Sequence, residues 1–115
     1  MPNEAELAVL DMGQLRDICM EDQELMRELV TALIDDAKAQ IPALEKAVES
    51  ADAKSCARLA HYVKGACANV GAVSMATILM NIERSAGEGD FEACRMSLSN
   101  LALELKKFSL QAAAI

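Results

Sequence analysis

Hydrophobic residues recur along this chain at helical spacing, in five segments separated by short polar breaks. The pattern predicts helices at about 12–19, 23–50, 53–70, 73–86 and 91–112. The longest apolar stripe belongs to the second segment and consists of Met26, Leu29, Val30, Leu33, Ala37, Ile41, Leu44 and Val48. No alternating apolar and polar pattern of useful length is present, so the sequence predicts helices and no strands.

The boundaries of these segments carry residues that start and stop helices. Asp11, Asp52 and Asp90 each stand just before an apolar stripe, where an aspartate side chain can accept hydrogen bonds from the first free backbone N–H groups. Gly71 follows the third segment and suits the left-handed turn that ends many helices.

The connections between segments are short, so helices that follow each other should run antiparallel. The sequence therefore predicts an all-α fold, an up-down-up-down antiparallel four-helix bundle with a short additional N-terminal helix. We expect Leu15 and Ile18 of that short helix to face inward. We divide the chain into a flexible N-terminal arm, residues 1–9, and one bundle domain, residues 10–115.

Composition and charge exclude several function classes. Hydrophobic residues make up 53% of the 115 residues and charged residues 25%, which supports a packed core. The formal net charge of −7 disfavours nucleic-acid binding, which needs a basic surface. No apolar run approaches the ~20 residues of a membrane span, and the first residues lack a signal-peptide pattern. We expect a cytoplasmic protein with no membrane association, monomeric because one bundle of this size can fold alone.

The four cysteines lie in or beside apolar helical stripes: Cys19, Cys56, Cys67 and Cys94. None forms a C-x-x-C pair, so zinc-type spacing is absent. We interpret them as buried, reduced thiols that behave as small hydrophobic residues; a redox pair is the alternative.

The single histidine lies on the outer face of the third predicted helix. The core stripe of this helix consists of Cys56, Leu59, Ala60, Val63, Cys67 and Val70. At ~100° per residue, His61 points roughly 150° away from that stripe. A lone histidine is often a core residue, but here the helical geometry predicts that the imidazole faces water.

The helical neighbours of His61 are unusual for a solvent-facing surface. Ala57, Gly65 and Ala68 are small where long polar side chains are expected, and Arg58 and Lys64 are both cationic. A mid-helix glycine costs ~1 kcal/mol relative to alanine. The close approach of another molecule beside His61 would explain Gly65, with the small side chains providing clearance.

This arrangement suits a carrier of phosphoryl groups. An exposed imidazole is largely neutral and nucleophilic near pH 7, and a lysine one turn away can neutralise charge on a transferred group. A helical adaptor in which His61 is idle is the alternative. A metal or cofactor enzyme is disfavoured, because one histidine without a Glu-x-x-His pair or inward carboxylates predicts no metal site.

The sequence resembles the histidine phosphotransfer (HPt) family of two-component phosphorelays over about residues 10–108. The resemblance rests on Ala60-His61-Tyr62-Val63-Lys64-Gly65, on Val70-Gly71-Ala72, and on Met75 and the Ile82-Glu83 pair, all at the family's spacing. It implies that His61 is phosphorylated, that Lys64 is the cation beside the phosphate and that Gly65 lets a partner approach. The family usually carries a small hydroxyl residue after Lys-Gly, where this chain has Ala66 and Cys67.

The resemblance also implies the partners. They are receiver domains of response regulators, or of a hybrid sensor histidine kinase, and such a receiver supplies the aspartyl phosphate and the Mg²⁺. The chain itself would need no cofactor and would be a carrier, not an enzyme on its own. Candidates for the docking surface are Arg58, Met12, Leu15 and Leu25; the three apolar side chains could instead close the end of the bundle.

Overall fold

The computed structural model describes residues 8–115, which form five helices. A short helix, α1 (Met12–Ile18), is followed by the four long ones: α2 (Gln23–Glu49), α3 (Ala53–Val70), α4 (Val73–Gly87) and α5 (Phe91–Ala112). Each boundary lies within one residue of the prediction. Within the described residues the fold is all-α, as the periodicity predicted.

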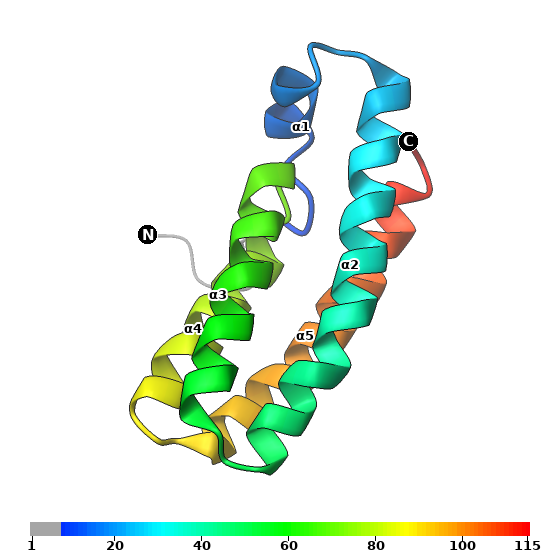
Figure 1. Ribbon diagram of the computed structural model, residues 1–115. Coiled ribbons are helices and arrows are strands. Elements are labelled where there is room, and N and C mark those ends of the chain that lie inside the picture. Colours follow the sequence, from blue (N-terminus) through cyan, green and yellow to red (C-terminus); the bar gives the residue numbers. More distant parts are fainter. Residues whose placement is uncertain (1–7) are drawn as a thin grey trace.

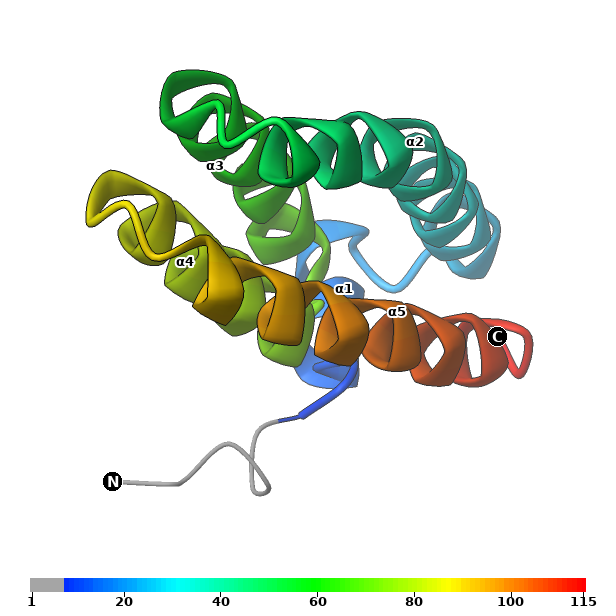
Figure 2. The same ribbon diagram turned by 90° about the horizontal axis from the view of Figure 1, so that it is seen from below.

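The four long helices form an antiparallel up-down-up-down bundle (Figure 1). Helices that follow each other in the chain pack together, and α5 closes the ring by packing against α2. Seen from the end, α2 and α3 form one layer and α4 and α5 the other (Figure 2). The short helix α1 lies at the end of the bundle, where it contacts α2 and α3.

The core consists of the apolar stripes of the long helices. Its largest fully buried side chains include Leu44, Val63, Leu79, Ile82 and Phe108. Because each side chain of this size stabilises the fold by roughly 1.5–3 kcal/mol when it leaves water, the stripes determine which face of each helix points inward. The face of α3 opposite its stripe is thereby left to solvent.

Aspartate side chains cap four of the five helices. The carboxylates of Asp11, Asp52 and Asp90 accept a hydrogen bond from the backbone three residues on, as predicted, and Asp22 does the same for α2. The first turn of α4 has no side-chain cap.

The segment before α1 provides the missing partner for α4. The backbone N–H of Ser74 donates to the carbonyl of Ala8 (3.0 Å), and the N–H of Asp11 donates to the carbonyl of Gly71 (2.8 Å). Gly71 has φ +87°, and a Cβ there would lie 2.9 Å from the carbonyl oxygen of Asp11. The turn between α3 and α4 therefore requires glycine for two reasons, its left-handed backbone and this close contact.

The structure corrects two predictions about the N-terminal part, the extent of the arm and the orientation of Ile18. Residues 8 and 9 belonged to the predicted arm, but Ala8 is hydrogen-bonded to the bundle and Val9 packs against its core; residues 1–7 lie outside the described residues. The inward orientation expected for Ile18 is wrong, since its side chain is 46% exposed. With only two turns, α1 buries Leu15 and the following Cys19 instead.

All four cysteines are free and buried, which agrees with their interpretation as small hydrophobic residues. Burial raises the pKa of the Cys56 and Cys67 thiols to about 12, so neither is ionised near pH 7.

Candidate functional site

The candidate site lies at the middle of α3, where His61 faces solvent. Its side chain is 67% exposed, which confirms the orientation predicted from helical geometry. The helix positions the ring, because Ala60 and Val63 on either side of His61 are buried in the core and turn position 61 outward.

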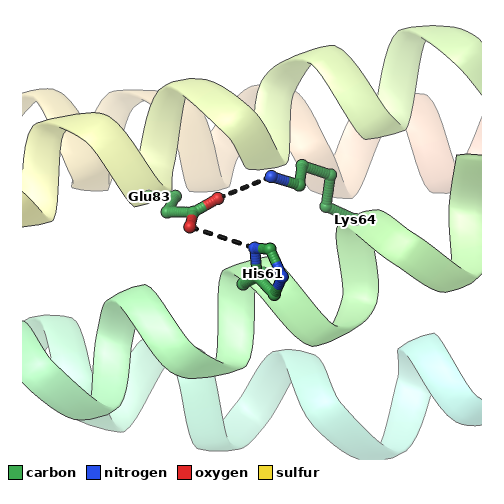
Figure 3. A network of polar contacts seen from close by, with 3 residues as sticks. All are labelled: His61, Lys64 and Glu83. Carbon is green, nitrogen blue, oxygen red and sulfur yellow. Dashed lines mark hydrogen bonds and ion pairs between the residues drawn. The ribbon is translucent and has the colours of Figure 1, made fainter.

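A carboxylate from the next helix holds the imidazole. The Nδ1 atom of His61 lies 3.1 Å from Oε2 of Glu83 on α4 (Figure 3). Since an ionised carboxylate can only accept hydrogen bonds, this contact requires a hydrogen on Nδ1. In a neutral ring the lone pair is then on Nε2, the nitrogen that Glu83 does not contact. The contact thus leaves Nε2 as the nucleophilic nitrogen.

The same carboxylate also binds Lys64. The Lys64 ammonium donates to Oε1 of Glu83 over 2.8 Å, so one carboxylate bridges the histidine and the lysine that the sequence had singled out (Figure 3). The hydrogen bond from Lys64, and then the positive charge of Lys64, hold the pKa of Glu83 below its usual range, with a smaller effect of His61. Glu83 is therefore ionised near pH 7.

Glu83 also belongs to the site, although no role for it was predicted from the sequence. Its signal was present, because the Ile82-Glu83 pair belongs to the pattern on which the family resemblance rests. The pairing itself could not be read from spacing along the chain, since Glu83 lies 22 residues beyond His61 on another helix.

Gly65, one turn beyond His61, is exposed and has open space around it. A Cβ built at this position would meet no atom within 4 Å outside the helix's own backbone. No contact within the described residues 8–115 therefore requires a glycine here, although glycine weakens the helix. This agrees with clearance for a separate molecule.

The two alanines predicted to flank the site differ in environment. Ala68 is exposed on the same face as Gly65, whereas Ala57 is partly buried and packs against the core. Packing against the core also favours a small side chain at position 57, so Ala57 supports an open surface less directly than Ala68.

A shallow, mainly apolar depression adjoins the site. It lies between Lys64, Gly65 and Ala68 of α3 and Val73, Thr77 and Met80 of α4. The side chain of Gln14 on α1 closes one end, where its Nε2 donates to the carbonyl of Ala68 (2.7 Å).

The candidates for the docking surface are not brought together. Leu15 is fully buried, so its assignment to a docking surface is wrong; the contacts of residues 8–11 with the α3–α4 turn hold α1 against the bundle and press Leu15 into the core. Leu25 is partly buried against the core, and Met12 lines a separate depression with residues near the C-terminus. Arg58 is exposed on α3, one turn before His61.

Among residues 8–115, no group of three or more His, Cys, Asp and Glu side chains is placed to hold a metal ion. None of the helices in this range combines the length and the hydrophobicity that a membrane-spanning segment needs.

An exposed imidazole on a helical bundle, with one ring nitrogen bound and the other open to a partner, suits a carrier of phosphoryl groups. The family model of the Hpt domain matches residues 28–111, which is most of the chain and includes the site. The chain belongs to the Hpt domain family, whose members carry phosphoryl groups on histidine in phosphorelays and interact with receiver domains.

A solved structure has the same fold. Histidine-containing phosphotransfer protein B (HptB) from Pseudomonas aeruginosa PAO1 matches with a TM-score of 0.85 at 22% sequence identity, over 92% of each chain. No curated protein matches the sequence.

Proposed function

We propose that His61 is the residue of this chain that accepts a phosphoryl group from a phospho-aspartyl receiver domain and passes it to another receiver. The observation that carries the proposal is the exposed imidazole whose Nδ1 is bound by Glu83, because that contact leaves Nε2 as the nucleophile. The Nε2 lone pair attacks phosphorus, the bond between phosphorus and the aspartate oxygen breaks, and the electron pair leaves with the aspartate carboxylate.

Lys64 is the cation beside the transferred group. Its ammonium lies one turn from His61 and is partly exposed, within reach of negative charge that develops near the ring. Because an ion pair that is still in contact with solvent contributes only ~0–1 kcal/mol, we expect Lys64 to tune the rate of transfer and not to anchor the complex.

The partner supplies the remaining chemistry. The receiver provides the aspartyl phosphate, the Mg²⁺ and most of the transition-state stabilisation, while this chain provides a positioned nucleophile and a docking surface. Gly65, Ala68 and the depression beside them support docking next to His61, and Arg58 adds positive charge on the same helix.

The proposal extends to the state of the protein in the cell. The net charge of −7 supports partners other than nucleic acid, and we infer a cytoplasmic monomer in which one bundle carries one phosphoryl group.

The test follows a labelled phosphoryl group. The chain is mixed with a phosphorylated receiver domain from a panel of such domains, and we expect an acid-labile, alkali-stable adduct that His61→Gln abolishes. A helical adaptor with an idle His61 would acquire no label. If the His61→Gln variant accepted phosphate as well as the parent, His61 would not be the carrier residue.

A further inference from the structure

The contact between Glu83 and His61 also bears on how the phosphoryl group leaves. The contact requires a proton on Nδ1, and the effect of this proton on phosphoryl donation rests on the proposed function of His61. During donation the N–P bond breaks and its electron pair stays on Nε2. If Nδ1 carries a proton, the ring departs as neutral imidazole; if it does not, the ring departs as an imidazolate anion, a far stronger base and a poorer leaving group.

We propose that Glu83 keeps the proton on Nδ1 while His61 carries the phosphoryl group, so that the ring always leaves as neutral imidazole. Glu83 is thus a positioning residue, which acts on the reacting nitrogen through the opposite side of the ring. Its carboxylate lies 3.1 Å from Nδ1, whereas the phosphoryl group is bonded to Nε2 on the other side of the ring, so the contact does not compete with the phosphoryl group for the same nitrogen.

The proton on Nδ1 is retained during both acceptance and donation of the phosphoryl group. On acceptance, the neutral ring with hydrogen on Nδ1 forms the N–P bond through Nε2 and becomes a phosphorylated imidazolium that faces the Glu83 carboxylate. On donation, the N–P bond breaks, an O–P bond forms on the receiver's aspartate, and the same proton remains on Nδ1. No proton enters or leaves the site in either step.

The surrounding charges favour this arrangement. Glu83 on α4 contacts both the His61 ring and Lys64 on α3, and Arg58 lies one turn before His61 on the same helix. In the unphosphorylated chain Lys64 shares the Glu83 carboxylate with His61. When Nε2 carries a phosphoryl group, Lys64 can also pair with the phosphoryl oxygens. The Glu83 carboxylate then pairs less with Lys64 and interacts more strongly with the imidazolium.

The experiment compares Glu83→Gln with the parent. The glutamine oxygen can still accept a hydrogen bond from Nδ1, but it carries no negative charge. The variant therefore keeps the hydrogen bond and removes only the attraction between the carboxylate and the ring. Glu88→Gln is the matched control, since Glu88 is an exposed carboxylate at the C-terminal end of the same helix and the substitution changes net charge equally.

Each protein is phosphorylated with phosphoramidate, a small compound with an N–P bond, and the excess reagent is removed. Transfer to a purified receiver domain is then timed between pH 6 and pH 9. An opposite charge at hydrogen-bond distance favours a protonated group by about one pH unit or more. The rate of Glu83→Gln should therefore begin to fall at a pH about one unit below that of the parent and of Glu88→Gln, so that at pH 8.5 it is about tenfold slower than both.

A second measurement needs no variant. Nitrogen-15 NMR of the histidine ring in the phosphorylated parent should show hydrogen on Nδ1 at pH 7.5. An Nδ1 without hydrogen under these conditions, or a Glu83→Gln variant with the parent's pH profile, would overturn the role of Glu83 in donation. A parent that phosphoramidate and phosphorylated receivers both fail to label would instead refute the proposed function.

Discussion

Substitution of Gly65 by glutamine should make the bundle more stable and the carrier worse. Gly65 lies inside α3, and nothing outside the helix's own backbone lies within 4 Å of the position that its Cβ would take. The new side chain therefore meets no clash within the chain. It replaces the poorest helix former except proline by a good one, a gain of about 0.5–1 kcal/mol.

The gain in the free energy of unfolding should raise the melting temperature. At about 2.1 cal/mol/K per residue, unfolding of a chain of this size has an entropy near 0.24 kcal/mol/K, so the gain corresponds to a rise of about 2–4 °C. Transfer should fall at least about tenfold, because a side chain standing between two docked surfaces separates them, and a displacement of about 1 Å at a reacting centre can cost about 100-fold in rate.

The matched control is Gly87→Gln. Gly87 is also a helical glycine with nothing within 4 Å of an added Cβ, but it is the last residue of α4. Thermal unfolding followed by far-UV circular dichroism, together with transfer from a phosphorylated receiver, measures both effects. The control should transfer like the parent. Normal transfer by Gly65→Gln would refute the argument that Gly65 provides clearance for the partner.

Three further outcomes are expected. Lys64→Ala should slow transfer by about tenfold while the melting temperature changes little, because an ion pair still in contact with solvent contributes only about 0–1 kcal/mol to stability; an unchanged rate would remove Lys64 from the mechanism. Gly71→Ala should lower the free energy of unfolding in urea by about 2–3 kcal/mol, from a left-handed backbone and a clash with the Asp11 carbonyl. Gly89→Ala, which has φ +74° but no neighbour within 4 Å, should lose only about 1 kcal/mol, and equal losses would exclude the clash as a cause. The Cys67 thiol, buried and with its pKa raised to about 12, should react with iodoacetamide at pH 8 only after urea unfolds the chain; rapid alkylation of the folded protein would contradict its burial.

Helix boundaries and faces could be predicted here because they depend on local chemistry. Each aspartate cap satisfies N–H groups of the next few residues, and Gly71 ends α3 through its own left-handed backbone. The outward orientation of His61 follows from the same short range, because 3.6 residues per turn places it opposite a stripe that must be buried.

The short helix α1 shows where local patterning becomes ambiguous. Two turns carry too few apolar positions to define a face, and both Leu15 and Ile18 were expected to point inward, although only Leu15 does. The orientation of α1 depends on contacts with the α3–α4 turn. There, Ala8 and Asp11 form backbone hydrogen bonds with Ser74 and Gly71, more than 55 residues further along the chain. No spacing within α1 carries that information.

The class of fold, the helix ends, and the position of His61 on an outer face beside a lysine and a glycine could all be predicted from local patterning. The contact that occupies one nitrogen of this histidine could not, because the Glu83 carboxylate reaches Nδ1 from a neighbouring helix. Helical periodicity is a property of a few consecutive residues. The register between two packed helices arises from how all their side chains fit together, and that fit determines which residue of α4 faces His61.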